Sequence, residues 1–426
     1  GRSRSVYITY RNHLVGMDAL VRPVVDPGFT AAALAFLFGG VALGTVSGLI
    51  PGIHANNFAL LLAGVAPGLH ADPLLIGVAI VGAGVVHSFL DIVPALALGV
   101  PDAATAVAAL PGHRLVVAGR GREALRLSAV GSGLAVALAV PLAVPITWLM
   151  VRAYPHVRAN LPLILGGIVA GLVLTESSRR SAVGGFCSFL ASAALGVATL
   201  DVDPAAPLDT GGMLAPLFSG LFGAPVLVDA LGGEGVPPQS DARLTMGRRD
   251  LGVSATAGSL AGAVVGYIPG VSAAIAAVAA LPLVPRREAD RGFVVATSGA
   301  NTATTVFALF ALVALGTPRT GVTVALEEAA VPLALPILLT AVATAAICGF
   351  TLVLLVGDRY LRVVGTADYT TLSVGVLCLL VVVSYAFAGA VGVGVFVVAA
   401  LLGLVPPRLG ARRVHLMGVL IGPLLL

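Results

Sequence analysis

The chain alternates long apolar runs with short polar connections along its whole length. A helix needs about 20 apolar residues to cross a bilayer, whereas a transmembrane β-barrel would show short segments of alternating polarity. The pattern therefore predicts an all-α polytopic membrane protein with about 10–12 transmembrane helices. Clear examples of the apolar runs are Ala31–Ile50, Ser128–Met150, Ser181–Leu200, Pro332–Val356 and Thr371–Ala388.

Composition supports this class. Charged residues make up only 10% of the 426, whereas a soluble domain carries about 25% because its surface faces water. All 24 basic residues are arginine, and the net charge of +4 is spread over the connections, which indicates membrane topology rather than nucleic-acid binding. The bias towards Arg, Ala, Val, Gly and Leu is typical of a GC-rich prokaryotic genome. We therefore expect a multi-pass protein of a prokaryotic plasma membrane, with Trp148 and Tyr154 at a membrane interface.

One pattern occurs twice along the chain. Gly44–Gly52 reads GTVSGLIPG and Gly262–Gly270 reads GAVVGYIPG, so both fit GxxxGxxPG at an offset of 218 residues. A second pair of landmarks follows in the same order, Gly99-Val-Pro101 and Gly316-Thr-Pro318. A lone GxxxG would be weak evidence, because packed membrane helices use small residues everywhere. Two landmarks at nearly constant separation indicate an internal duplication.

The duplication divides the chain into four parts. We expect a polar N-terminal extension at residues 1–16, a first membrane repeat at 17–231, a linker at 232–250 and a second repeat at 251–426. Met17 is the expected start, because the residues before it are polar and contain no apolar signal core.

The charges of the connections favour inverted repeats. Residues 68–73 contain no arginine, whereas their counterpart 285–291 contains three; residues 112–126 contain four, whereas their counterpart contains Glu327 and Glu328. Arginine-rich short loops stay in the cytoplasm, so equivalent loops are expected on opposite sides. One observation opposes this: Arg22 and the arginines of the linker place the start of both repeats inside.

The landmarks predict broken or re-entrant helices. Proline lacks the amide hydrogen, and glycine tolerates strained dihedral angles. Broken backbone at membrane depth survives only against protein or a water-filled cavity, where its free N–H groups attract anions and its free carbonyls attract Na⁺. The expected helix breaks are Pro51, Pro269, Pro101 and Pro318.

Polar side chains near the breaks form the predicted binding site, in which glycines give backbone access and neutral hydroxyls and amides act as ligands. For each hydroxyl the alternative is a bond back to its own helix. A functional role is favoured for the cluster around Asn301, because asparagine is costly in a lipid-facing helix. The predicted substrate- and ion-binding residues are Gly52, His54, Asn56, Asn57, Gly270, Ser272, Asn301, Thr302 and Thr305.

His87 and Asp91 are four residues apart, on one helical face, in a stretch expected to be embedded in the membrane. An intramembrane carboxylate is a candidate carrier of a coupling proton. The alternative is a structural His–Asp pair, and the sequence leaves both open. We expect Na⁺ or H⁺ as the coupling ion and no other metal or cofactor.

At these positions the sequence resembles the large membrane subunit of the tripartite tricarboxylate transporter family. That family's repeats carry GxxxGxxPG, and its second half has an A-N-N-A segment and a later L-G-I-P-G. These are similar to Ala300-Asn301-Thr302-Ala303 and Leu315-Gly316-Thr317-Pro318 here. The resemblance covers nearly all of 17–426. It implies transport of di- or tricarboxylates together with a small membrane subunit and an extracytoplasmic substrate-binding protein.

The chain departs from the family pattern at several glycines. Ile53-His54-Ala55-Asn56 follows the first Pro-Gly, Leu90–Pro94 replaces a Gly-Gly-Ser-Thr-Thr region, and Asp102 and Arg319 follow the prolines of the second landmark pair. Arg319 would attract an anion, whereas Asp102 would repel one. The resemblance therefore leaves the substrate open within the class of small organic anions.

The leading hypothesis is cation-coupled secondary transport of small organic anions by alternating access. One alternative is a carrier or flippase for a lipid-linked phosphate, because helix N-termini also suit phosphate. The other is an intramembrane enzyme, which is disfavoured because the chain has no HExxH, no GxSxG and no nucleotide-binding loop. Besides the substrate, membrane lipid is an expected partner, and an oligomer is left open.

Overall fold

The computed structural model describes residues 26–50, 53, 55–98, 109–208, 212–229, 231, 237–240, 243–280, 283–285, 288–364 and 368–425. Every regular element in this part of the chain is a helix, which confirms the predicted all-α polytopic membrane class. Seven of these helices are long and apolar enough to cross a membrane: Pro27–Leu49, Pro73–Ala97, Gly121–Ala159, Arg179–Thr199, Ala289–Leu315, Leu335–Val364 and Thr370–Arg408.

Shorter helices complete the bundle. The described ranges contain three further apolar helices of 10–17 residues, Leu161–Leu174, Leu214–Asp229 and Arg413–Leu425. The expected number of about 10–12 passes treats each apolar run as one full crossing. Within one of the long helices, α16, the backbone bends at Ala388 and Gly389, where the φ of Gly389 is +57°.

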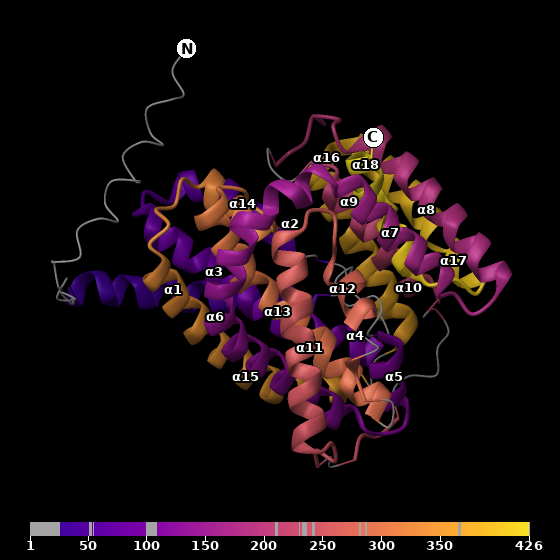
Figure 1. The fold of residues 1–426 in the computed structure, drawn as a ribbon, viewed down its shortest axis with the longest axis horizontal. Helices are drawn as coiled ribbons and strands as arrows, with labels where there is room; N and C mark the ends of the chain where they lie inside the picture. The colour runs from indigo at the N-terminus through magenta and orange to yellow at the C-terminus, as the bar shows by residue number, and fades with distance from the viewer. Residues whose placement is uncertain are drawn as a thin grey trace.

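The elements of the two halves follow a similar order along the chain (Figure 1). The first half contains α1 (Pro27–Leu49), α2 (Ala55–Val65), η1 (Ala66–Leu69), α3 (Pro73–Leu90), α4 (Ile92–Leu98), α5 (Ala109–Val117), α6 (Gly121–Ala159), α7 (Leu161–Leu174), α8 (Arg179–Thr199), α9 (Leu214–Phe218), η2 (Ser219–Gly223) and α10 (Ala224–Asp229). The second half contains α11 (Arg248–Tyr267), α12 (Ala273–Ala280), α13 (Ala289–Leu315), α14 (Gly321–Glu328), α15 (Leu335–Val364), α16 (Tyr369–Gly403), α17 (Val405–Arg408), η5 (Arg413–Met417) and α18 (Gly418–Leu425).

Short polar side chains determine where several helices begin. Asp26 accepts a hydrogen bond from the Gly28 N–H at 2.8 Å at the start of α1, and Asp72 accepts one from the Leu74 N–H at 2.8 Å at the start of α3. In both helices proline is the first residue, a position whose backbone N–H makes no hydrogen bond within the helix, so the missing N–H of proline costs nothing there. These apolar helices therefore start at defined residues without a charged first turn.

Equivalent glycines make equivalent contacts in the two halves. On α1, a Cβ added to Gly40 would lie 2.2 Å from the carbonyl oxygen of Ala79 on α3. On α11, a Cβ added to Gly258 would lie 2.4 Å from the carbonyl oxygen of Ala296 on α13. Each glycine lies one turn before its GxxxG motif, so the small residues allow α1–α3 and α11–α13 to pack backbone to backbone.

Equivalent helices of the two halves run in opposite directions. The starts of α6 and α13 lie together, because Arg291 Nε donates to Glu123 Oε1 at 2.9 Å. The end of α15 lies at the same place, because Arg122 Nε donates to Asp358 Oδ1 at 2.5 Å. By element order α15 is the counterpart of α6, so the pair is antiparallel. This arrangement supports inverted repeats, which stay a prediction.

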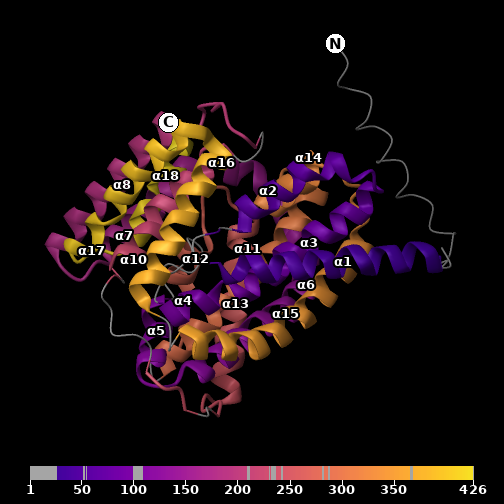
Figure 2. The same ribbon diagram turned by 180° about the vertical axis from the view of Figure 1, so that it is seen from behind.

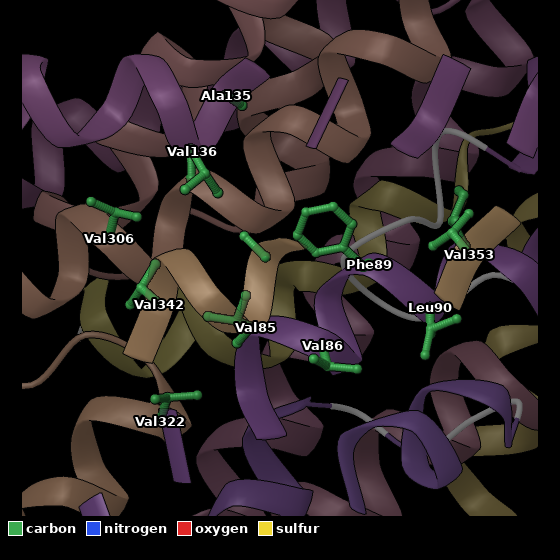
Figure 3. Close-up of a cluster of buried hydrophobic side chains, with 14 of the residues drawn as sticks. Val85, Val86, Phe89, Leu90, Ala135, Val136, Val306, Val322, Val342 and Val353 are labelled. Carbon is green, nitrogen blue, oxygen red and sulfur yellow. The ribbon is translucent and has the colours of Figure 1, made fainter. Parts of the chain in front are cut away.

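Two hydrophobic clusters hold the bundle together, and each combines elements of both halves. The larger is built mainly on α1, α3, α4, α6, α13 and α15, and Figure 3 labels Phe89, Val136, Val306 and Val353 among its buried side chains. The second is built mainly on α7, α9, α11, α12, α16 and the C-terminal helices. Helix α11 contributes buried residues to both clusters and lies between the group of α1, α3 and α15 and the group of α7, α8 and α16 in Figures 1 and 2. The repeats are therefore intertwined in space.

A buried ion cluster joins the C-terminal segment to the connection between α7 and α8. The Glu176 carboxylate, which is 3% exposed, accepts from Arg412 Nε at 2.9 Å and is hydrogen-bonded to His415 Nε2 at 2.8 Å. Burial alone would raise the pKa of the Glu176 carboxyl, but the hydrogen bonds from Arg412 and His415 outweigh it and hold this pKa below its ordinary value.

We predict that Glu176→Gln destabilises the protein at neutral pH by about 3 kcal/mol, because it removes one partner of a buried charged cluster. A carboxyl with a lowered folded-state pKa stabilises the fold fully above its ordinary value of 4.5, and this contribution decreases as the pH falls through the folded-state pKa. The difference in thermal unfolding midpoint between wild type and Glu176→Gln should therefore become smaller below about pH 4.5. Substitution of the exposed Glu328 by glutamine is the control. A midpoint difference for Glu176→Gln that does not change with pH would contradict the lowered pKa of Glu176.

We also predict that alanine substitution has different effects on stability at two adjacent glycines of α1. Gly40→Ala should lower the free energy of unfolding by about 1–3 kcal/mol, because its Cβ collides with the α3 backbone. Gly39→Ala has nothing within 4 Å of the new Cβ and should be neutral or stabilising, because alanine favours the helix by about 1 kcal/mol. Thermal unfolding in detergent measures both, and equal midpoints would contradict the packing described above.

Candidate functional site

A cavity of about 150 Å³ with a partly polar lining lies where elements of both halves and of both clusters meet. It is enclosed by residues of α2, α3, α9, α11, α12, α13, α14 and the C-terminal helices. Its polar lining consists of Ser88, Ser272, Asn301, Thr304, Thr305, Arg319 and Thr320, together with the backbone around Gly270.

One wall of the cavity is the connection between α11 and α12. Helix α11 ends at Tyr267 and α12 begins at Ala273, so Pro269 and Gly270 lie between two helices. Gly270 has a φ of +79°, a conformation that residues with a Cβ rarely adopt. The Ser272 hydroxyl accepts from the Ile275 N–H at 3.3 Å and caps α12. The N-terminal end of α12 therefore lines the cavity.

The opposite wall is the turn between α13 and α14. Helix α13 ends at Gly316, whose φ is +62°, and Pro318 follows in the turn. Thr320 then begins α14 with a reciprocal capping box to Thr323. The first turns of α12 and α14 therefore both contribute to the cavity, and each carries N–H groups with a positive partial charge. This pairing suits an anion.

Arg319 supplies a full positive charge to the same cavity. Its guanidinium lies 5.0 Å above the ring centre of Tyr154 and donates a hydrogen bond to the Tyr154 hydroxyl. Its Nε is buried without a hydrogen-bond partner, and no carboxylate in the described ranges forms an ion pair with it. The cavity is thus lined by a cation that Tyr154 holds and that no described carboxylate neutralises, which makes it the complement of a carboxylate.

Asn301 connects the cavity to a buried carboxylate. Its side chain lines the cavity, and its Nδ2 donates to Asp91 Oδ2 at 2.6 Å and to the Ser88 carbonyl at 3.4 Å. The Asp91 residue is only 4% exposed. An event at the cavity that reorients the amide would therefore change the environment of Asp91 directly.

Two further predicted residues are fully buried. Thr302 is 0% exposed, and its hydroxyl bonds to Ser132 Oγ at 2.9 Å and to the Ser298 carbonyl at 3.2 Å, so it joins α13 to α6. His87 is also 0% exposed; its Nδ1 is 2.9 Å from Ser47 Oγ on α1, and its ring stacks on Phe58. Neither residue lines the cavity.

The remaining predicted residues belong to the first half. Gly52, His54, Pro51 and Pro101 lie outside the described residues. Asn56 and Asn57 lie in the first turn of α2, but their side chains are outside what the structure describes. Ala55, at the start of α2, does line the cavity. The structure thus brings together Gly270, Ser272, Asn301 and Thr305 of the predicted set.

Sequence reasoning did not include Arg319, Tyr154 or Ser88 among the site residues. The expectation that Tyr154 lies at a membrane interface stays a prediction, and the structure adds that its ring and hydroxyl hold the guanidinium of Arg319. The signal for Arg319 was its place directly after Pro318, at a predicted helix break. The distance of 165 positions between Tyr154 and Arg319 leaves no pattern in the sequence that would pair them.

We predict that Ser272→Cys reacts with a small hydrophilic thiol reagent and that Ser259→Cys does not. Ser272 lines the cavity, whereas Ser259 is 0% exposed between α11 and α6. Both substitutions are made after replacing the native cysteines at 187, 348 and 378 by serine, and labelling is followed by mass spectrometry. Equal labelling of the two positions, or none at Ser272→Cys in folded protein, would contradict the cavity.

Comparison with known proteins agrees with the resemblance seen in the sequence. The profile of the tripartite tricarboxylate transporter TctA family matches residues 34–418. An uncharacterized protein of Methanocaldococcus jannaschii is 31% identical over 301 residues, which cover 69% of this chain and 72% of that protein. No solved structure matches. The chain is a multi-pass membrane protein that belongs to the TctA family of tripartite tricarboxylate transporters.

Proposed function

We propose that this chain is the translocating subunit of a transporter for small organic anions of the carboxylate class, and that the central cavity is its substrate site. The observation that carries the proposal is Arg319, a cation in the cavity that pairs with no carboxylate of the described chain. The N-terminal ends of α12 and α14 add positive partial charge beside it. The neutral groups of Ser272, Asn301 and Thr305 provide further ligands without repelling an anion.

Asp91 is the proposed coupling site. A substrate carboxylate near Asn301 and an ionised Asp91 beyond it would repel each other in a low-dielectric interior. A proton on Asp91, or Na⁺ bound to its carboxylate, removes this repulsion, so anion and cation bind better together than apart. The contact of Asn301 Nδ2 with Asp91 Oδ2 provides the physical link between the two events.

Alternating access would follow from the antiparallel counterparts of the two halves. The cavity lies between the larger cluster, on α3 and α13, and the second cluster, on α9 and the C-terminal helices. A movement of one cluster relative to the other would open the cavity first to one side and then to the other. We expect a small membrane subunit and an extracytoplasmic substrate-binding protein as partners, in a prokaryotic plasma membrane.

We predict that the purified protein in liposomes takes up labelled citrate, succinate or a related carboxylate when an inward Na⁺ or proton gradient is present. Arg319→Gln should weaken uptake about tenfold or more, because it removes a charge-assisted hydrogen bond to the substrate. Arg319→Lys should retain part of it. Arg152→Gln is the matched control, since Arg152 stacks on Trp148 outside the cavity.

Unchanged uptake by folded Arg319→Gln would contradict the assignment of Arg319. No uptake of any carboxylate by folded wild-type protein, with a binding protein also supplied, would contradict the carboxylate proposal. The lipid-linked phosphate alternative would then be tested in the same vesicles.

We further predict that Asp91→Asn separates transport from coupling. A permanently neutral side chain keeps the hydrogen-bonding shape but no longer gains or loses a cation. Counterflow exchange of substrate should therefore persist, whereas accumulation driven by an ion gradient should be lost. Both assays are made on one preparation, so that persisting counterflow shows that the Asp91→Asn protein is folded. Gradient-driven accumulation at the wild-type level would exclude Asp91 as the coupling group.

A further inference from the structure

One side of α6 is a stripe of exposed residues that faces away from the bundle. Leu134, Val144 and Trp148 lie on it, with exposed fractions of 37%, 63% and 61%. Their spacing follows the helical repeat, so they share one face. Arg126 is exposed on the same face, about two turns before Leu134. In a membrane protein an exposed apolar stripe is the lipid-facing surface, so Arg126 lies on the lipid side of the helix.

The depth of Arg126 follows from its distance to Trp148. The two residues are 22 positions apart in α6, which corresponds to about 33 Å of helix at 1.5 Å per residue. The hydrocarbon core of a bilayer is about 30 Å thick, and tryptophan is enriched at its interface. With Trp148 at one interface, the Arg126 guanidinium lies at the headgroup level of the opposite leaflet.

Helix α15 lies beside α6 (Figures 1 and 2). It presents a second stripe of exposed apolar residues. Ile347 and Leu355 are 69% and 58% exposed on it, and the exposed Arg359 follows one turn later. Arg122 at the start of α6 binds Asp358 near the end of α15, so these two helix ends lie together. Each stripe therefore has an arginine at this end of the bundle.

A pocket of about 420 Å³ lies between these helix ends, lined by Arg122, Leu125, Arg126, Leu354 and Asp358. Asp358 already binds Arg122 at 2.5 Å and Arg362 at 2.7 Å. Arg126 and Arg359 pair with no carboxylate of the described chain. The pocket lining thus contains two arginines and one aspartate, and Arg359 and Arg362 lie within about one helical turn of Asp358 on α15, so this end of the two helices has an excess of positive charge.

Further arginines lie at this end of the bundle, close to the start of α6. Arg120 and Arg291 both bind Glu123 there, and the linker residue Thr245 donates to the same carboxylate. By the positive-inside rule this end faces the cytoplasm. The pocket therefore opens towards the inner leaflet.

We propose that the pocket between α6 and α15 binds the phosphate of an anionic phospholipid of the inner leaflet. Guanidinium groups bind phosphate oxygens through paired, charge-assisted hydrogen bonds, and basic pockets between transmembrane helices are suited to anionic headgroups. The acyl chains lie along the exposed stripes of α6 and α15. A free phosphate ion would use the same arginines but would gain nothing from these apolar stripes, which favours the lipid.

The test is a titration of the delipidated full chain in detergent with phosphatidylglycerol, with phosphatidylcholine of the same acyl chains, or with inorganic phosphate. Bound lipid is counted by native mass spectrometry, and thermal unfolding is measured in parallel. Phosphatidylglycerol should bind with an affinity at least about tenfold above that of phosphatidylcholine. Arg126→Gln and Arg359→Gln should each weaken its binding about fivefold, the effect of one basic residue at an anionic surface.

Arg158→Gln is the matched control, because Arg158 is an exposed arginine at the other end of the same helix. It should retain wild-type binding of phosphatidylglycerol. Equal affinity for the two lipids, wild-type binding by folded Arg126→Gln and Arg359→Gln, or an equal loss in Arg158→Gln would overturn the proposal. Displacement of the lipid by millimolar inorganic phosphate would also overturn it, because the site would then be one for a soluble anion.

Discussion

Every peptide N–H and C=O group at membrane depth must find a hydrogen-bond partner, because hydrocarbon offers none and each unpaired group costs several kcal/mol. Long helices satisfy this requirement over most of the bundle. The connections α11–α12 and α13–α14 do not continue a helix, and both border the central cavity. Where the backbone leaves the helix, it therefore lies against a space that can hold water or a ligand. These two interruptions border the cavity, whereas the break at Ala388 and Gly389 of α16 does not line it.

Close packing of small residues makes this arrangement stable. Gly40 on α1 and Gly258 on α11 lie against the backbones of α3 and α13, with no room for a Cβ. Helix α3 carries Asp91 at its end and α13 carries Asn301, so the glycine contacts position both partners of the 2.6 Å hydrogen bond. A substitution far from the cavity can therefore change its geometry without touching a lining residue.

Charge is distributed along the bundle in a way that separates two roles. At the arginine-rich end, Glu123 and Asp358 neutralise several arginines and join helices of both halves. Arg319 lies instead in the turn before α14, where an aromatic ring and a hydroxyl hold it and no described carboxylate neutralises it. The paired arginines stabilise and orient the bundle, whereas Arg319 leaves its charge available to a ligand in the cavity.

The sequence alone determined the helical membrane class and the interruptions between α11 and α12 and between α13 and α14, because these depend on local features: apolar length, Pro-Gly and the spacing of small residues. The internal duplication stays a prediction. It also singled out four residues of the cavity: Gly270 and Ser272 lie between α11 and α12, and Asn301 and Thr305 lie on α13, about three to four turns before its end.

Only the tertiary structure decided which residues meet. Thr302 and Asn301 are adjacent in the sequence, yet one packs against Ser132 and the other reaches Asp91. Tyr154 meets Arg319 because α6 is long and α14 begins beside its end. Neighbours along a helix point in directions about 100° apart, so their partners depend on which other helices surround them. That depends on packing across the whole chain, which no local pattern encodes.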